Sequence, residues 1–87
     1  MVSEKITITN ETGLHARPAS VFVNTAAKFK SEIMLQKGEK QVNAKSILAV
    51  LSLGISKGTE VMLSAQGADE AEAVSRLTEL IHENFNE

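Results

Sequence analysis

Apolar and polar residues alternate along residues 2–10 and again along residues 58–67. This alternation predicts two strands that each bury one face, because successive side chains of a strand point to opposite sides. The apolar residues expected to point inward from these two strands are Val2, Ile6, Ile8, Val61, Leu63 and Ala65.

The spacing changes to that of an amphipathic helix over residues 16–28. Pro18 fits the first turn of this helix, where a missing N–H costs nothing. A second, short helix is predicted within residues 45–54, with Ser46 as the N-cap and Gly54 just past the last turn. The apolar faces of the two helices consist of Ala19, Phe22, Val23, Ala26, Ile47, Val50 and Leu51.

Residues 31–43 have the pattern of a hairpin with its turn around Gly38. The longest helix is predicted over residues 68–85, where Asp69 and Glu72 form an Asp-x-x-Glu variant of the capping box. The inward-pointing residues of the hairpin and this helix are Ile33, Leu35, Val42, Val74, Leu77 and Ile81.

The resulting order is β-α-β-β-α-β-α, which predicts an α+β fold of two layers. Each predicted strand has one apolar face and each helix one apolar stripe, so the helices should pack on one side of a mostly antiparallel sheet. The chain has 87 residues, enough for one domain and too few for two. We therefore expect a single domain over residues 1–87.

Composition narrows the possible functions. The net charge of −2 argues against a protein that binds nucleic acid through its phosphates, and three phenylalanines without Trp or Tyr leave little for base stacking. No apolar run reaches 18 residues, so no membrane insertion is expected. The N-terminus lacks the pattern of a secretory signal, which favours the cytoplasm. There is no cysteine.

The stretch "GLHARPAS" places His15 directly before the first helix and Arg17 in its first turn. A helix N-terminus offers unpaired N–H groups, here those of Ala16 and Arg17, and favours anions. A nucleophilic imidazole beside these amides and a guanidinium suits a transient phosphohistidine. The plainer interpretation is a loop histidine or weak cap. No metal-ligand cluster, phosphate loop or cofactor motif accompanies it, so any catalysis would come from a partner.

Three segments, "TGLHARPAS", "NAKSILAVLSLGISKGTEV" and "AQGADE", together resemble HPr, the histidine phosphocarrier family of the bacterial phosphoenolpyruvate:sugar phosphotransferase system. The resemblance covers the whole chain. It implies an open-faced sandwich whose antiparallel sheet has the order 1-4-2-3. It also implies that His15 accepts a phosphoryl group on Nδ1 from phospho-enzyme I and passes it to enzyme IIA domains. Arg17 and the Ala16 amide would hold the phosphate, with a weaker role for Thr12.

Ser46 has two interpretations. As an N-cap it would stabilise the second helix by roughly 1 kcal/mol without any regulatory part. The resemblance to HPr proteins of Gram-positive bacteria implies instead that an ATP-dependent HPr kinase/phosphorylase phosphorylates it. The modified protein would then be a corepressor for catabolite control protein A.

Leu48 lies off the apolar stripe of the second helix, so it is either exposed or at the edge of the core. The resemblance favours a docking patch for partners that contains Ile47, Leu48 and Leu51, with Leu14 and Ser20 beside the histidine. The patch departs from the common Gram-positive pattern, which often has methionine at positions 48 and 51 and glycine at position 49. The second histidine, His82, matches no motif of the family. We expect the chain to be a monomer.

Three rival functions differ from the phosphocarrier. A regulatory-only paralogue would act through Ser46 alone, and the presence of His15 argues against it. A small acyl-phosphate hydrolase would need a glycine-rich phosphate loop after the first strand, which is missing. A ferredoxin-like RNA binder would need aromatic residues on its strands, and the predicted strands have none.

Overall fold

The computed structural model describes residues 1–9, 16–83 and 85 of the chain. Over these residues the elements follow one another in the predicted order. Their bounds are β1 (Val2–Thr7), α1 (Ala16–Ala26), β2 (Glu32–Lys37), β3 (Lys40–Asn43), α2 (Ile47–Leu51), β4 (Glu60–Gln66) and α3 (Glu70–His82).

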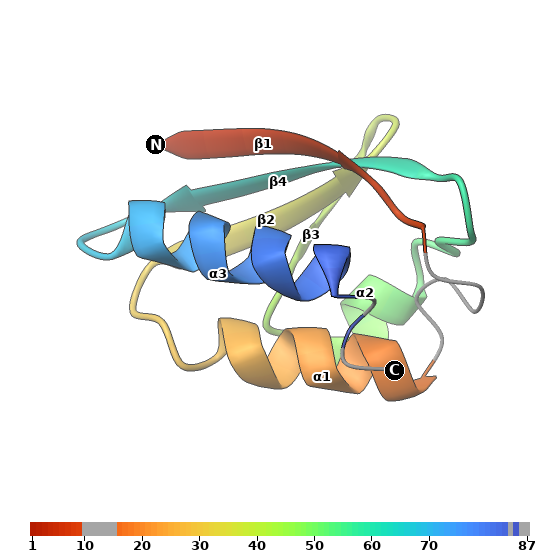
Figure 1. Cartoon of the computed structure of the whole chain (residues 1–87), viewed down its shortest axis with the longest axis horizontal. Helices are drawn as coiled ribbons and strands as arrows, with labels where there is room; N and C mark the ends of the chain where they lie inside the picture. The colour runs from red at the N-terminus through yellow and green to blue at the C-terminus, as the bar shows by residue number, and fades with distance from the viewer. Residues whose placement is uncertain (10–15, 84, 86–87) are drawn as a thin grey trace.

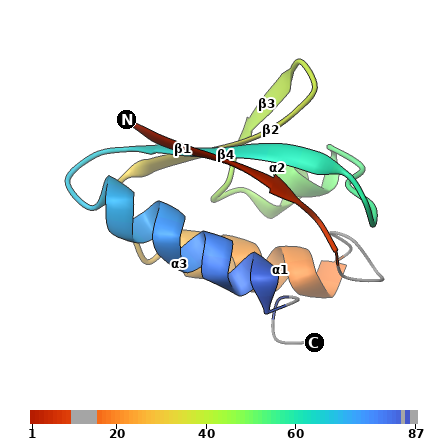
Figure 2. The same ribbon diagram turned by 45° about the horizontal axis from the view of Figure 1, so that its top comes forward.

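The four strands form one antiparallel sheet with the order β1-β4-β2-β3, which confirms the predicted 1-4-2-3 arrangement. The register places apolar residues in rows across the sheet. Leu35 of β2, for example, lies opposite Leu63 of β4 on one side and Val42 of β3 on the other. All three helices lie on the same side of the sheet, and α1 and α3 run alongside each other (Figures 1 and 2).

The core fills the space between the helices and this side of the sheet. Every apolar residue that periodicity predicted to point inward from the strands or from α3 belongs to the core or packs against it. The side chains that lie fully inside include Phe22, Ile33, Leu63 and Leu77. The opposite side of the sheet faces outward, so the fold is an open-faced α+β sandwich (Figure 2).

The turn between β2 and β3 consists of Gly38 and Glu39, as expected from the sequence. Gly38 has φ +60°, which a two-residue hairpin loop requires at its first position. Gly54 also has positive φ and follows α2, which ends three residues earlier. Both glycines therefore stand where the sequence predicted a change of chain direction.

The predicted capping box of α3 is wrong. Asp69 is the N-cap residue, but its side chain makes no capping hydrogen bond. Its carboxylate instead accepts hydrogen bonds from the N–H groups of Lys30 and Ser31, at 2.8 Å each, and from the Ser31 hydroxyl. Near the start of α3, Glu70 accepts a hydrogen bond from the Gly67 N–H at 3.1 Å. A contact between distant segments thus replaces the local motif.

The apolar face of α2 also differs from the prediction. Val50 is fully buried and Leu51 half-buried, but Ile47 is 36% exposed. Leu53, which lies after the helix, is 5% exposed and belongs to the core. The short helix thus turns its first residue toward solvent.

Candidate functional site

The first turn of α1 begins at Ala16, directly after the histidine of the sequence motif. Ala16 and Arg17 are exposed, whereas Pro18 and Ala19 are buried and fix the start of the helix against the core. N–H groups in a first turn have no partner within the helix, so they face outward as potential anion donors.

Among the residues that the structure describes, the Arg17 guanidinium has no hydrogen-bond or ion-pair partner. It lies off the buried stripe of α1, as predicted. An exposed guanidinium at a helix start is available to an external anion. The predicted residues His15, Thr12 and Leu14 lie outside the described residues.

Ser46 is the N-cap of α2, as the sequence predicted. Its backbone is extended, with φ −111° and ψ 115°, and its Oγ accepts a hydrogen bond from the Ala49 N–H at 3.3 Å. Its side chain is therefore engaged with the backbone of α2, at the helix end where negative charge is favoured.

Leu48 lies two residues after Ser46 and is 78% exposed, which excludes a place at the edge of the core. Together with Ile47 it forms an apolar surface at the start of α2, which we call the α2 patch. Leu51 is half-buried at the border of this patch, and Ser20 is half-buried on α1. Since α1 and α2 pack against each other, the first turn of α1 and the α2 patch belong to one helical layer.

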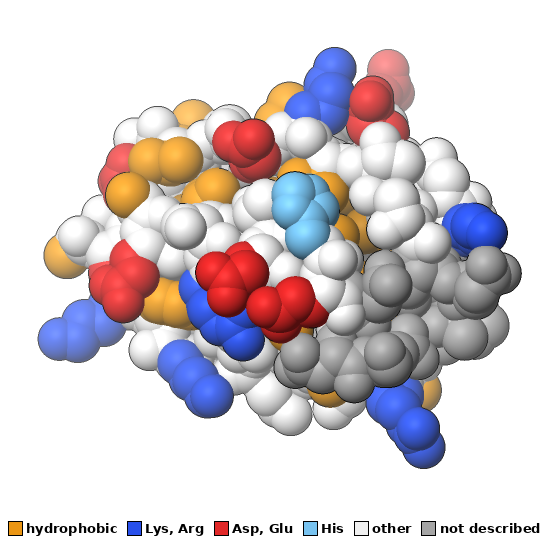
Figure 3. Space-filling model, in the orientation of Figure 1, with side chains coloured by type: hydrophobic (Ala, Val, Ile, Leu, Met, Phe, Trp, Pro, Cys, Tyr) orange, Lys and Arg blue, Asp and Glu red, His pale blue; other side chains and the backbone are white. Residues whose placement is uncertain are grey.

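Charge is divided between the elements. Residues 16–31 and 40–59, which contain α1 and α2, carry six basic side chains and no Asp or Glu. Acidic side chains gather over α3 instead, as Figure 3 shows on one face of the molecule. Of the six basic residues, only Arg17 lies in α1 and none lies in α2, whereas the others lie in the segments that flank these helices and in β3. These segments are therefore positively charged although the whole chain is acidic, and positive charge there favours acidic partners.

Not all of these cations are free. The Lys45 Nζ donates a hydrogen bond of 2.7 Å to the carbonyl of Phe29, in the loop that follows α1. Lys45 precedes Ser46, so this contact fixes the approach to α2 against the end of α1. The sequence pattern does not indicate this contact, because spacing does not show which distant carbonyl a lysine reaches.

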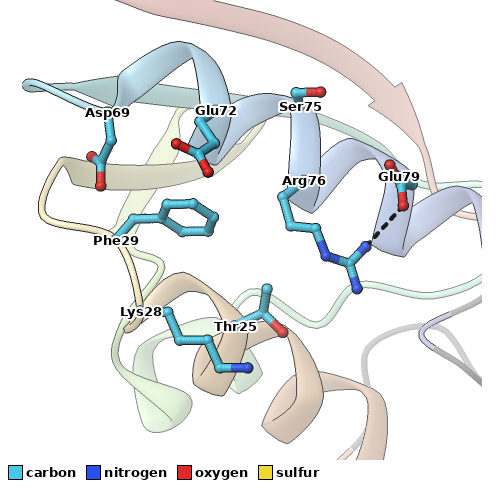
Figure 4. Close-up of a pocket in the computed structure, with 8 residues that line it drawn as sticks. All are labelled: Thr25, Lys28, Phe29, Asp69, Glu72, Ser75, Arg76 and Glu79. Carbon is cyan, nitrogen blue, oxygen red and sulfur yellow. Dashed lines mark hydrogen bonds and ion pairs between the residues drawn. The ribbon is translucent and has the colours of Figure 1, made fainter.

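A separate groove of about 620 Å³ lies between the end of α1 and α3 (Figure 4). Arg76 of α3 points into it and pairs with Glu79 at 3.3 Å. The groove lies at the end of α1 away from Ala16, about 15 Å along a helix of this length. Its lining residues are Thr25, Lys28, Phe29, Asp69, Glu72, Ser75, Arg76 and Glu79. It is thus distinct from the candidate site.

Within residues 1–9, 16–83 and 85, no three His, Asp or Glu side chains converge as metal ligands. No helix in this described part of the chain is long and apolar enough to cross a membrane. His82 is exposed near the end of α3.

A family model described as "PTS HPr component phosphorylation site" matches residues 2–83. The chain belongs to the HPr family. The match spans β1 to the end of α3, so it includes both the first turn of α1 and the N-cap of α2. This places the chain among the phosphocarrier proteins of the phosphotransferase system, as its motifs implied.

Named relatives agree. The chain is 49% identical over 83 residues to the HPr-like protein Crh of Bacillus subtilis, which covers 95% of this chain and 98% of Crh. It is 46% identical over 87 residues to the phosphocarrier protein HPr of Neisseria meningitidis, with 100% and 98% coverage. The family therefore includes both a phosphocarrier and an HPr-like protein at similar identity.

The fold is also that of a solved HPr structure. HPr from Thermoanaerobacter tengcongensis superposes with a TM-score of 0.97 at 54% identity, covering 100% of this chain and 98% of that one. A second structure of HPr from that organism is described as a dimer, with a TM-score of 0.81, 56% identity and 94% coverage of both chains. Dimers therefore occur among the solved HPr structures.

Proposed function

We propose that this chain is a phosphocarrier that accepts a phosphoryl group on Nδ1 of His15 from phospho-enzyme I and donates it to enzyme IIA domains. The observation that carries the proposal is the first turn of α1, which begins at Ala16 and leaves the Arg17 guanidinium exposed and unpaired among the described residues. Membership of the HPr family supports the same role.

The chemistry needs little from the chain itself. As the phosphorus–nitrogen bond to His15 forms, the bond to the carrier atom of enzyme I breaks, and no water takes part. The phosphoryl oxygens would then face the Ala16 and Arg17 amides and the Arg17 guanidinium, which stabilise negative charge. Thr12 would add a weaker contact. We propose that the partners supply the catalysis, so the chain acts as a carrier and not as an enzyme.

We further propose that Ser46 is a regulatory site for an ATP-dependent HPr kinase/phosphorylase, and that the phosphorylated form is a corepressor for catabolite control protein A. The N-cap position supports this proposal, because a phosphate of about −1.5 to −2 charge is favoured at a helix start. We propose that the docking surface consists of the α2 patch and Leu51, together with Ser20 of α1 and Leu14 of the histidine motif.

The distribution of charge over the chain supports docking of acidic partners near α1 and α2. Enzyme I would approach the segments of residues 16–31 and 40–59, which contain α1 and α2 and carry six basic residues and no acidic ones. Docking would take place in the cytoplasm with a monomer, whose α2 patch is accessible. Light scattering at the protein concentration used for phosphotransfer tests the oligomeric state. A dimer whose transfer rate decreases as the protein concentration increases would contradict a monomeric carrier.

A regulatory-only role is the second candidate, favoured by 49% identity to Crh. It would use Ser46 without phosphoryl transfer at position 15. The two candidates differ in one measurement, the acid-labile phosphate formed from phosphoenolpyruvate.

Reconstitution with phosphoenolpyruvate and a heterologous enzyme I, followed by mass measurement, decides between them. We expect one added phosphoryl group that acid removes. His15→Ala should abolish the label, and the matched control His82→Ala should keep it, because His82 is exposed near the end of α3. Full labelling of the His15→Ala protein would contradict the assignment, and no label on the unchanged chain would favour the regulatory-only role.

A further inference from the structure

Helix α2 is only five residues long, too short to be stable by its own hydrogen bonds. Its N-terminus is capped by Ser46. At its C-terminus, the carbonyls of Leu48, Val50 and Leu51 accept backbone N–H groups of the residues that follow, and the Ala49 carbonyl accepts the Ser52 hydroxyl at 2.6 Å. Among the described residues, none of these backbone N–H groups donates to the next three carbonyls.

Those three carbonyls belong to Ser52, Leu53 and Gly54. Each accepts a hydrogen bond from the ammonium group of a lysine in the β2–β3 hairpin. The Lys37 Nζ donates to Leu53 at 3.0 Å and to Gly54 at 2.9 Å. The Lys40 Nζ donates to Ser52 at 3.3 Å. We call these three hydrogen bonds the hairpin clamp. Cations at this end are also favoured by the helix dipole.

The two lysines differ in their surroundings. Lys37 is half-buried at the last position of β2 and bridges two carbonyls. Lys40 is exposed at the first position of β3, and its single bond is longer. The two residues pair across the turn, so the backbone of the hairpin fixes both stems. Lys37 should therefore carry most of the clamp.

Few buried apolar contacts hold a helix as short as α2, so directional contacts add to what fixes its orientation. Val50 and Leu53 are buried, and apolar packing is non-directional. Hydrogen bonds to three successive carbonyls are directional. Since α2 has less than two turns, a displacement of its C-terminal end would move the whole helix, including the exposed Leu48 at 78% exposure.

We propose that the β2–β3 hairpin orients α2 through the hairpin clamp, and that Lys37 is thereby a positioning residue for docking at the α2 patch. The kinetic part of this proposal rests on the proposed phosphocarrier function. Lys37 acts through α2, because its ammonium donates to the Leu53 and Gly54 carbonyls that follow the helix.

Amide hydrogen exchange tests the structural part without any partner. Lys37→Met keeps the stem and removes the ammonium, and we expect the amides of Ser52, Leu53 and Gly54 to exchange about tenfold faster. Lys40→Met should have a smaller effect. The matched control is Lys30→Met, because Lys30 is exposed and its ammonium has no partner within the described part of the chain. Unchanged exchange in Lys37→Met would overturn the proposal.

Steady-state phosphotransfer from enzyme I tests the positioning part. Lys37→Met should raise KM for this chain about fivefold and leave kcat unchanged, because docking and not chemistry is affected. Lys37→Arg should restore both KM and slow exchange, since a guanidinium can also donate to two carbonyls. Faster exchange with an unchanged KM would overturn the positioning role. If the unchanged chain accepts no phosphoryl group, the proposed function fails, whereas the exchange experiment still decides whether Lys37 holds α2.

Discussion

Asp69, at the start of α3, is joined to Ser31, which precedes β2, by two hydrogen bonds to the same carboxylate oxygen. The Ser31 N–H donates at 2.8 Å and its hydroxyl at 2.5 Å. The second oxygen accepts the Lys30 N–H at 2.8 Å. The two residues lie 38 positions apart in the sequence. Their hydrogen bonds therefore connect the loop between α1 and β2 to the start of α3.

The Ser31–Asp69 contact predicts a specific pH dependence. The Ser31 hydroxyl, followed by the Lys30 N–H, lowers the pKa of Asp69 from its ordinary value near 3.8 to about 2. Because this pKa is lower in the folded chain, the contribution of Asp69 is complete above about pH 4 and is lost as pH falls toward 2. Ser31→Ala should raise the pKa of Asp69 toward its ordinary value, measured by NMR titration of the carboxyl carbon.

The matched control is Ser3→Ala, an exposed serine on β1 that is remote from the contact. It should leave the titration of Asp69 unchanged. An Asp69 carboxyl that titrates near 3.8 in the unchanged chain would contradict the contact itself.

Gly67 lies against the same serine, Ser31. A Cβ at position 67 would lie 2.7 Å from the Ser31 Cα, and the φ of +153° disfavours any other residue. Gly67→Ala should therefore lower the free energy of unfolding by about 2–4 kcal/mol, from strain and overpacking together. Urea denaturation measures it. Gly58→Ala separates the two causes, because Gly58 has φ +90° with open space around it, and should cost about 1–2 kcal/mol. Equal costs at both positions would exclude the steric explanation.

The sequence predicted the elements well, because each has one buried face and its periodicity records that face. It failed where the partner of a side chain is distant. Asp69 is followed by Glu72 in a local capping pattern, but its carboxylate is taken by Ser31, and nothing in the spacing of residues indicates that contact. Helical spacing predicted that Ile47 and Val50 lie on the same face of α2. It did not indicate that the core extends beneath Val50 and leaves Ile47 36% exposed.

In the candidate site, too, the sequence predicted the local contacts and not the distant ones. The N-cap role of Ser46 is local, so the residue type and the start of the apolar spacing were sufficient to predict it. The bonds of Lys37 to the carbonyls after α2 join residues 16 and 17 positions apart and depend on how the hairpin lies against the helix. Such contacts follow from the assembled fold and not from local pattern.

Phe85 should matter more to stability than its place near the end of the chain suggests. It is 1% exposed, and its ring meets that of Phe22 edge to face with centroids 6.3 Å apart. Phe85→Ala should lower the free energy of unfolding by about 3–5 kcal/mol. Phe85→Leu, which retains most of the volume, should cost less than about 1.5 kcal/mol. Met62→Ala, half-buried on the outward side of the sheet, is the control, and a similar loss there would argue against a special role for the aromatic pair.

Arg17 should serve phosphoryl transfer more than folding. Its side chain is exposed and unpaired within the described residues, so Arg17→Glu should change stability by only about 0.5 kcal/mol. The same change should slow transfer from enzyme I at least about tenfold, because a cation is replaced by an anion beside the phosphate. Lys28→Glu makes the same charge change just beyond the other end of α1 and should slow transfer much less. Outright unfolding of Arg17→Glu in a thermal melt would show that the residue is structural.

Ser46→Asp should weaken docking without unfolding the chain. Ser46 caps α2 through a bond from the Ala49 N–H to its Oγ, and aspartate offers an oxygen in the same position. The added charge lies at the favourable end of the helix dipole, so stability should change by less than about 1 kcal/mol. Beside the α2 patch, however, it opposes association with an acidic enzyme I surface. We therefore expect KM for this chain to rise more than kcat falls, and salt to restore part of the reaction by screening.

Direct repulsion between Ser46→Asp and phosphate at His15 would act differently. If one unit charge and a phosphate of about −2 charge were about 10 Å apart in water, they would interact by only about 0.8 kcal/mol, which is too little to collapse the maximal rate. Steady-state transfer at low and high ionic strength distinguishes the two mechanisms, with Ser3→Asp as a control that adds the same charge on an exposed position of β1. If KM stays constant in Ser46→Asp while kcat collapses at both salt concentrations, coupling reaches the histidine itself and docking is not the regulated step.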